Sequence, residues 1–104
     1  MKQVEAIIHP SLVDDVKDRL TLVGVRGMTI HQLAILGFQW APAGSQPFAT
    51  RICVRIVATA DMVETIVNAI LTVARRTEAD GRILITPVIE AIRIRTGETG
   101  ADAL

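Results

Sequence analysis

Two arginines near the carboxy end are spaced so that they can act together on an anion. Arg93 and Arg95 alternate with Ile92 and Ile94, and alternate side chains of an extended chain lie on one face. Two guanidinium groups on one face can clamp a polyphosphate through bidentate hydrogen bonds. A solvated face with salt bridges fits the same pattern, so the residues alone leave both interpretations open.

A second candidate for phosphate binding is the step Asp80-Gly81-Arg82. Glycine allows backbone N–H groups to approach a phosphate closely, and Arg82 adds positive charge beside them. An Asp-Gly turn in front of a strand explains the same three residues at least as well. The motif therefore becomes informative only together with other features of the chain.

Residues that could catalyse a reaction are few. His9 and His31 are the two histidines, and neither has the evident Ser or Cys partner that nucleophilic catalysis requires. We expect His9 to cap the turn after the first strand, His31 to lie within a strand and Cys53 to be buried. A single cysteine excludes an intrachain disulfide and a cysteine metal cluster. The sequence therefore predicts a protein that is not an enzyme and binds no metal.

Composition limits the function classes further. The chain has 104 residues, half of them apolar, which suits one domain with a real core. Lys and Arg together number 11, as do Asp and Glu, so bulk attraction to nucleic acid or to an anionic membrane is not expected. No apolar run reaches the ~20 residues of a membrane span, and residues 1–5 do not resemble a signal peptide. We expect a cytoplasmic protein without direct membrane insertion.

The elements that must position these residues follow from apolar periodicity and from breaker residues. Ser11 with Asp14 resembles a capping box at the start of a first helix, and Gly24 suits the end of that helix. Pro and Gly mark residues 37–49 as a long loop, and such loops are usually functional or disordered. Residues 96–104 look polar and loosely held. The other elements are strands at 3–8, 28–36, 51–57 and 82–88, a helix from about 61 to 76, and an extended segment at 92–95.

This order predicts a single α+β domain, residues 1–104, of the ferredoxin-like type. Strand–helix–strand occurs twice, which is the split βαβ arrangement (β-α-β-β-α-β) with both helices on one face of an antiparallel sheet. The strands on either side of the loop carry apolar residues in both registers, for example Met28 and Ile30 against Leu33 and Ile35. A solvated face would be more polar, so we expect the second face to be buried in an oligomer.

Three stretches resemble the PII signal-transduction family. Residues 1–10 look like that family's first strand and turn, residues 25–29 like the start of its second strand, and residues 92–98 like its C-terminal signature. The resemblance implies a homotrimer that binds ATP or ADP in the clefts between subunits. It also implies a protruding loop that contacts enzymes, transporters or regulators, and in many members 2-oxoglutarate joins Mg-ATP at the base of that loop.

The resemblance also assigns roles to individual residues. Thr29 would contact the base, while Ile7 and Val57 would pack on the purine. The phosphates would lie against the C-terminal arginines and the glycine-containing step. Taken one at a time, these are ordinary strand, loop and core residues. The implied nucleotide-binding set is Ile7, Gly27, Met28, Thr29, Gly37, Gln39, Arg55, Val57, Asp80, Gly81, Arg82, Arg93 and Arg95, and the anion-binding set is Gln39, Arg51 and Arg55.

Departures from the family pattern shape the expected ligand. Residues 75–82 lack two glycines of the family's phosphate loop and include Glu78, which would repel a γ-phosphate, so we favour ADP or AMP over ATP. Ile35 and Arg55 replace a Gly and a Glu of the nucleotide site. The loop at 37–49 is shorter than the family's loop. The chain has no Tyr, which excludes control through nucleotidylation of a loop tyrosine.

The sequence thus predicts a divergent PII-like regulator without catalysis and without a cofactor. An adenine nucleotide is its expected regulatory ligand. A small anion such as bicarbonate, held by Arg51 or Arg55, would connect it with carbon metabolism. An unidentified enzyme or transporter is the expected protein target. The alternatives are a standard nitrogen regulator responding to ATP and 2-oxoglutarate, a small phosphatase or ATPase on the same fold, and a purely structural trimer.

Overall fold

The computed structural model describes residues 1–36, 48–75 and 81–104. Within them the strands are β1 (Lys2–Ile8), β2 (Thr29–Leu36), β3 (Phe48–Ala58) and β4 (Arg82–Pro87), and the helices are α1 (Val13–Leu22) and α2 (Val63–Ala74). Short 3-10 helices are η1 (Pro10–Leu12), η2 (Ala60–Met62) and η3 (Gly100–Ala103). β3 begins at Phe48, so the last two residues of the loop expected at 37–49 belong to a strand. The predicted site residues Gly37, Gln39 and Asp80, and also Glu78, lie outside the described residues.

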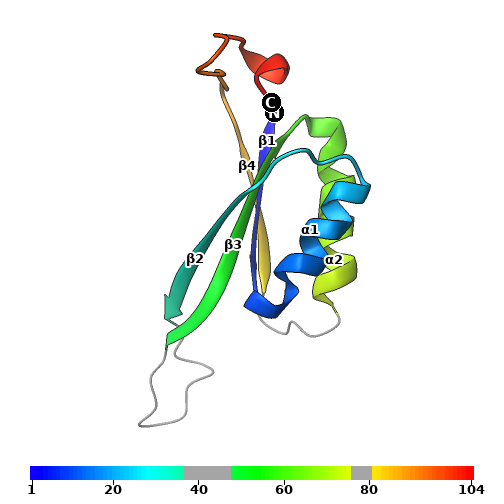
Figure 1. Cartoon of the computed structure of the whole chain (residues 1–104), viewed down its shortest axis with the longest axis vertical. Coiled ribbons are helices and arrows are strands. Elements are labelled where there is room, and N and C mark those ends of the chain that lie inside the picture. The colour runs from blue at the N-terminus through cyan, green and yellow to red at the C-terminus, as the bar shows by residue number, and fades with distance from the viewer. Residues whose placement is uncertain (37–47, 76–80) are drawn as a thin grey trace.

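The strands of this part of the chain form one antiparallel sheet in the order β2-β3-β1-β4. Both helices lie side by side on one face of the sheet (Figure 1). The register places Glu5 of β1 opposite Arg55 of β3 on one side and opposite Leu84 of β4 on the other. The predicted ferredoxin-like split βαβ arrangement is confirmed.

Alternation along the central strands decides which side chains form the core. Val4 and Ile8 of β1 are buried beneath the helices, together with Val54 and Ile56 of β3. β3 is therefore divided into an apolar face beneath the helices and a face that carries Arg51 and Arg55. The helices complete the core with Val16 and Leu20 of α1 and with Ile66, Ala69, Ile70 and Val73 of α2.

No helix in the described segments is both long and apolar enough to cross a membrane.

The first helix begins differently from the prediction. Ser11 does not cap α1, because it lies within η1 and its hydroxyl is 2.8 Å from Nδ1 of His9. His9 Nδ1 accepts the Ser11 backbone N–H at 3.1 Å and so caps η1, which confirms the role expected of His9. Gly24 follows the last residues of α1 with a φ of 96°, a left-handed conformation that favours glycine at a helix end, as predicted.

The segment after β4 is folded, so the expectation of a loosely held tail at 96–104 is wrong. A β-bridge pairs Ile92 with Thr99. The Gly100 N–H donates to the Ala91 carbonyl at 3.0 Å, and η3 follows directly. These bonds turn the chain back towards β1, and the two ends of the chain lie close together (Figure 1).

A tight turn replaces the extended segment expected at 92–95. Residues 94–96 form the turn, which is closed by the Arg93 N–H donating to the Glu98 carbonyl at 2.9 Å and by the Gly97 N–H donating to the Arg93 carbonyl at 2.7 Å. Arg93 and Arg95 therefore do not share one face of a strand. The alternating sequence could not reveal this, because a short bridged turn and a strand can carry the same pattern.

Ile70→Ala tests the core between α2 and the sheet. Ile70 is fully buried, so its truncation should leave a cavity and lower the free energy of unfolding by about 2–5 kcal/mol. Leu22→Ala is the matched control, because Leu22 on α1 is 79% exposed and its truncation should change that free energy by less than about 0.5 kcal/mol. Denaturant unfolding at equal protein concentration measures both. Equal midpoints for the two variants would contradict the assigned core.

Candidate functional site

Five of the predicted site residues come together around one open cleft of about 400 Å³, which we call the Thr29 cleft. It lies where β2 begins and β3 ends. Two residues that were not predicted, Gln3 and Leu104, complete its lining. The lining consists of Gln3, Gly27, Met28, Thr29, Arg55, Val57 and Leu104.

Strand register explains why these residues meet. Thr29 pairs with Arg55 across β2 and β3, and Val57 pairs with Gln3 across β3 and β1. Arg55 and Val57 are two residues apart, so their side chains leave the sheet on the same face, away from the helices. A Cβ at Gly27 would meet nothing within 4 Å, so packing within the chain does not require glycine there.

A hydrogen-bonded group orients Arg55 at the edge of the Thr29 cleft. The Cys53 thiol donates to Glu5 Oε1 at 3.0 Å, and Arg55 Nε lies 3.5 Å from the same oxygen. The hydrogen bond from Cys53 lowers the pKa of Glu5, and the charge of Arg55 acts in the same direction against the effect of burial. Burial, followed by the Glu5 carboxylate, raises the pKa of Cys53 to about 11. Cys53 is therefore a buried, protonated donor, which confirms its predicted burial.

His31 lies within β2, as predicted, and pairs with Cys53 across β2 and β3. The thiol donates to Glu5 rather than to the imidazole, so these two residues do not form an activated nucleophile. In the described segments no group of three His, Cys, Asp or Glu side chains is arranged to hold a metal ion.

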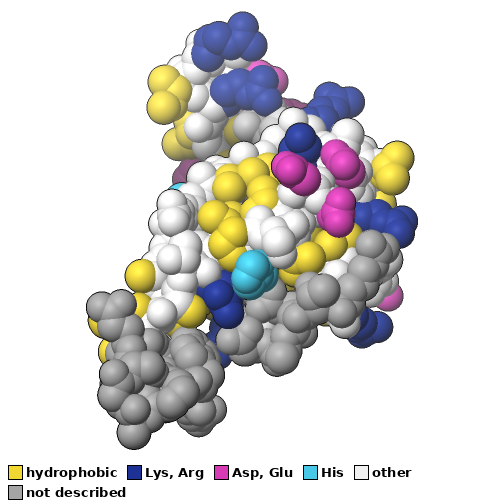
Figure 2. All heavy atoms as spheres, turned by 60° about the horizontal axis from the view of Figure 1, so that its bottom comes forward, with side chains coloured by type: hydrophobic (Ala, Val, Ile, Leu, Met, Phe, Trp, Pro, Cys, Tyr) yellow, Lys and Arg dark blue, Asp and Glu magenta, His cyan; other side chains and the backbone are white. Residues whose placement is uncertain are grey.

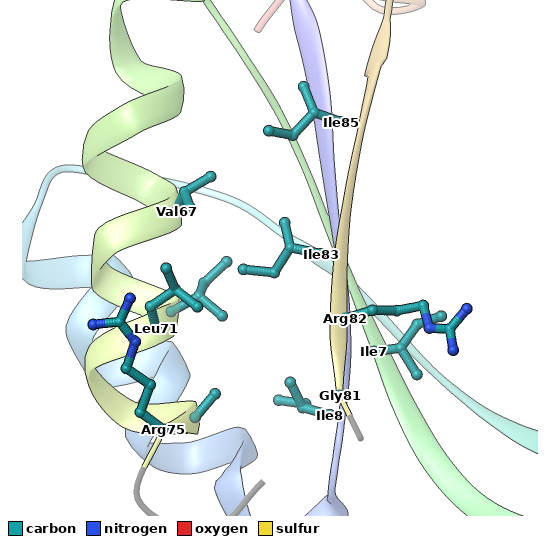
Figure 3. Close-up of a pocket in the computed structure, with 11 residues that line it drawn as sticks. Ile7, Ile8, Val67, Leu71, Arg75, Gly81, Arg82, Ile83 and Ile85 are labelled. Carbon is teal, nitrogen blue, oxygen red and sulfur yellow. The ribbon is translucent and has the colours of Figure 1, made fainter. Parts of the chain in front are cut away.

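Ile7 and Arg82 lie further along the same sheet face, outside the Thr29 cleft. They pair across β1 and β4, and Figure 3 shows both side chains pointing away from α2. Ile7 is four residues from Gln3, about 13 Å at the usual rise of a strand. Gly81 directly precedes Arg82 in the chain. Arg51 Nη1 donates to the Thr50 carbonyl at 2.9 Å. The structure thus separates the predicted residues into two groups at opposite ends of one face.

Another cavity, of about 310 Å³, lies on the helix-bearing face between α2 and β4. Val67 and Leu71 of α2 face Ile83 and Ile85 of β4 across it, and Arg75 lies at its edge (Figure 3). Apart from Arg75, the labelled side chains that point into it are apolar. The predicted residues Ile7, Gly81 and Arg82 also contribute to its lining, although the Ile7 and Arg82 side chains point away from α2.

The two C-terminal arginines have different surroundings. Arg93 Nη2 donates to the Leu104 carbonyl oxygen at 2.8 Å, and Leu104 lines the Thr29 cleft, so Arg93 is connected with that group. Arg95 is exposed in the turn at 94–96, and it has no hydrogen bond or ion pair within the part of the chain that the structure describes. Basic side chains are gathered at this projecting end of the molecule (Figure 2).

Sequence reasoning missed Gln3 and Leu104. Alternation could have revealed Gln3, because it shares a strand face with Glu5 and Ile7. No periodic signal marks Leu104, whose position depends on the turn at 94–96 and on hydrogen bonds between residues far from any strand or long helix.

Comparison with known proteins agrees with this geometry. The model of the family described as "Nitrogen regulatory protein P-II" matches residues 1–98. A nitrogen regulatory protein P-II of Cereibacter sphaeroides is 40% identical over 112 residues, which cover 100% of both chains, and one of Nostoc punctiforme is 39% identical with the same coverage. The solved structure of Arabidopsis thaliana PII bound to citrate has a TM-score of 0.85 at 35% sequence identity, and the match covers 99% of this chain and 91% of that one.

These matches include all three stretches in which the sequence resembles PII proteins, since residues 1–10, 25–29 and 92–98 lie within the matched range. The relatives are named as regulatory proteins. The chain belongs to the P-II family of nitrogen regulatory proteins.

Proposed function

We propose that this protein forms a homotrimer, binds ADP or AMP in clefts between subunits, and controls a protein target through residues 37–49. One observation carries the proposal. The predicted nucleotide residues form two groups at opposite ends of one sheet face, the Thr29 cleft and the pair Ile7 and Arg82. Neither group encloses a nucleotide by itself. The Thr29 cleft of one copy placed against the Ile7 end of a second copy would do so.

Exposed apolar residues support contact between copies on this face. Val57 of β3 and Leu84 of β4 lie on the side away from the helices and are 36% and 46% exposed. In the segment after β4, Ile89 and Ile94 are 98% and 99% exposed. Apolar surface of this extent is typical of subunit interfaces. Covering it would also shield the Cys53–Glu5–Arg55 contacts from water.

The basic residues favour a short phosphate chain. Arg82 and the C-terminal arginines supply positive charge, but residues 75–82 lack two glycines with which family members surround a triphosphate. Fewer glycines leave fewer backbone N–H groups able to approach phosphate oxygens. ADP or AMP is therefore the proposed ligand, and ATP the weaker one.

A small anion such as bicarbonate is the second proposed ligand. Arg51 and Arg55 alternate on one face of β3, and a guanidinium group binds a planar anion through two parallel hydrogen bonds. Arg55 is paired with Glu5, and Arg51 lies three residues after Phe48, the first residue of β3. An anion at Arg51 would therefore be placed to influence the loop.

Signalling requires that ligands favour different arrangements of the loop. β2 and β3 pair from Thr29 opposite Arg55 to Leu36 opposite Phe48, and they lead directly into residues 37–47. A ligand that contacts the base of the loop in one arrangement shifts the population by its difference in affinity between the arrangements. The target protein would then recognise one arrangement better than the other.

A standard nitrogen regulator that responds to ATP and 2-oxoglutarate is the second candidate. The observation that favours it is the set of relatives named nitrogen regulatory protein P-II, at up to 40% identity over the whole chain. Its ligand requirement differs from the first proposal, so the two can be separated by calorimetry.

Arg82→Ala and Arg95→Ala should each weaken ADP binding about tenfold or more, because a hydrogen bond between charged groups contributes about 1.5–3 kcal/mol. Arg19→Ala on the exposed side of α1 is the matched control and should leave the affinity unchanged. Isothermal calorimetry measures the affinities, and light scattering should show a trimer for all three variants. Unchanged affinity in both test variants would remove these arginines from the site.

Mixed trimers test whether the site is shared between subunits. Arg82 lies at the start of β4 and Arg95 in the turn after β4, and the proposed trimer would bring them together from two subunits. Subunits of the two variants refolded together should therefore regain intact sites at about a quarter of their interfaces, by random assembly of a symmetric ring. The refolded mixture should show a fraction of tight ADP sites that neither variant shows alone. Absence of that fraction would place the nucleotide within a single subunit.

Addition of 2-oxoglutarate with Mg-ATP should produce little or no binding heat, because residues 75–82 lack two glycines with which family members surround a triphosphate. The measurement is calorimetry with ATP, ADP and AMP, each with and without 2-oxoglutarate and with and without bicarbonate. Micromolar binding of 2-oxoglutarate in the presence of Mg-ATP would favour the standard nitrogen regulator instead.

A further inference from the structure

Leu104 forms part of the wall of the Thr29 cleft, where the proposed function places a nucleotide. It lines that cleft with Met28 and Thr29, and it also lines a neighbouring cleft of about 280 Å³ together with Val25 and Met62. Leu104 is 41% exposed, so it lines both clefts but is not part of the buried core. A segment of the chain therefore lies across the surface that the base would contact.

Leu104 also engages one of the proposed phosphate ligands. Arg93 Nη2 donates to its carbonyl oxygen at 2.8 Å, and a guanidinium N–H in that bond is not available to a phosphate oxygen. The Leu104 side chain thus lines the part of the cleft that the base would contact. The Leu104 backbone oxygen binds Arg93, which would otherwise contact phosphate.

Backbone hydrogen bonds give this arrangement a defined geometry. The Gly100 N–H donates to the Ala91 carbonyl, and the Leu104 N–H donates to the Ala101 carbonyl at 3.2 Å, which closes η3. Gly100 has a φ of 64°, in the left-handed region that favours glycine. The position of Leu104 therefore follows from how residues 91–100 fold, and not from an accidental surface contact.

We propose that η3 and Leu104 act as an internal competitor of the nucleotide. This inference rests on the proposed function, because it names a regulation of that same site. With Leu104 in place the cleft is narrowed on the side that the base would contact, and one N–H of Arg93 is engaged by the Leu104 backbone oxygen. Nucleotide binding releases Leu104, frees the Arg93 guanidinium for phosphate, and displaces η3 from the end of the sheet.

The size of the effect follows from the population of open clefts. The apparent affinity for nucleotide equals the intrinsic affinity multiplied by the fraction of molecules in which Leu104 has left the cleft. η3 spans four residues, and the hydrogen bond between Leu104 and Arg93 is exposed to solvent, so the local stability of this segment is low and a ligand can readily release it. By thermodynamic linkage, the factor by which docked η3 lowers the affinity for nucleotide equals the factor by which bound nucleotide lowers the stability of docked η3.

Two variants of the full chain test the inference through ADP affinity. Leu104→Ala removes the side chain from the cleft, and Gly100→Val disfavours the backbone conformation that leads into η3, at a position where an added Cβ meets nothing within 4 Å. Both variants should bind ADP about 3- to 10-fold more tightly, because a larger fraction of clefts is open. Leu22→Ala makes the same chemical change at an exposed position that lines neither of these two clefts and should bind ADP like the unchanged protein.

Amide hydrogen exchange gives a second readout that does not depend on the variants. Exchange of the Gly100 and Leu104 amides in the unchanged protein should become faster when ADP is added at saturating concentration, since ADP displaces the segment whose hydrogen bonds protect them. Slower exchange at both amides would show that the segment closes over the ligand instead of competing with it.

The outcomes separate this inference from the proposed function. If the unchanged protein binds ADP and both variants bind it with equal or lower affinity, the competitor role is overturned while the nucleotide site stands. If neither the unchanged protein nor either variant binds ADP, AMP or ATP, the proposed function fails and the inference fails with it. Tighter binding in both variants with faster exchange supports the inference.

Discussion

The central strand β1 determines where every polar group of the site can lie. Val4 and Ile8 must be buried beneath the helices, and because side chains of a strand alternate, this places Gln3, Glu5 and Ile7 on the opposite face. A shift of one residue in the pairing with β3 or β4 would exchange the two faces. Packing of the core therefore fixes the positions of the polar groups, although none of them contributes to that core.

The outer face has a hydrogen-bonded centre and two open ends. Cys53, Glu5 and Arg55 connect β1 with β3 in the middle of the sheet, with the Thr29 cleft at one end and Ile7 with Arg82 at the other. In the proposed trimer each copy would use one end against one neighbour and the other end against the second neighbour. Such a head-to-tail contact closes into a ring if the rotation between copies is right, and every ligand site would then report on two subunits.

The parts of this structure that the sequence could predict are those in which side-chain periodicity controls the backbone. The order of strands and helices, the division of β3 into two faces and the left-handed Gly24 all follow from local patterns. The cap of η1 shows a limit: Ser11 and His9 both offer side-chain acceptors, and the choice between them depends on where the first turn begins.

The segment after β4 could not be predicted in the same way. Its fold depends on hydrogen bonds such as the one from Gly100 to Ala91, which join residues without any apolar repeat between them. Ile92, Arg93, Ile94 and Arg95 alternate as a strand would, yet the structure turns at 94–96. The same turn brings Leu104 to the cleft and separates Arg95 from Arg93. This one turn therefore accounts for two differences between the predicted site and the observed one.

The burial of Cys53 has a practical consequence for spectroscopy. Alkylating dyes and spin labels react with thiolates, and this thiol has no exposed surface and a pKa raised to about 11. A second cysteine introduced on the exposed surface of η3, for example at Asp102, could therefore be labelled selectively in the native protein without replacing Cys53. The contact between the thiol and Glu5 would stay intact in the labelled molecule, and with it the orientation of Arg55.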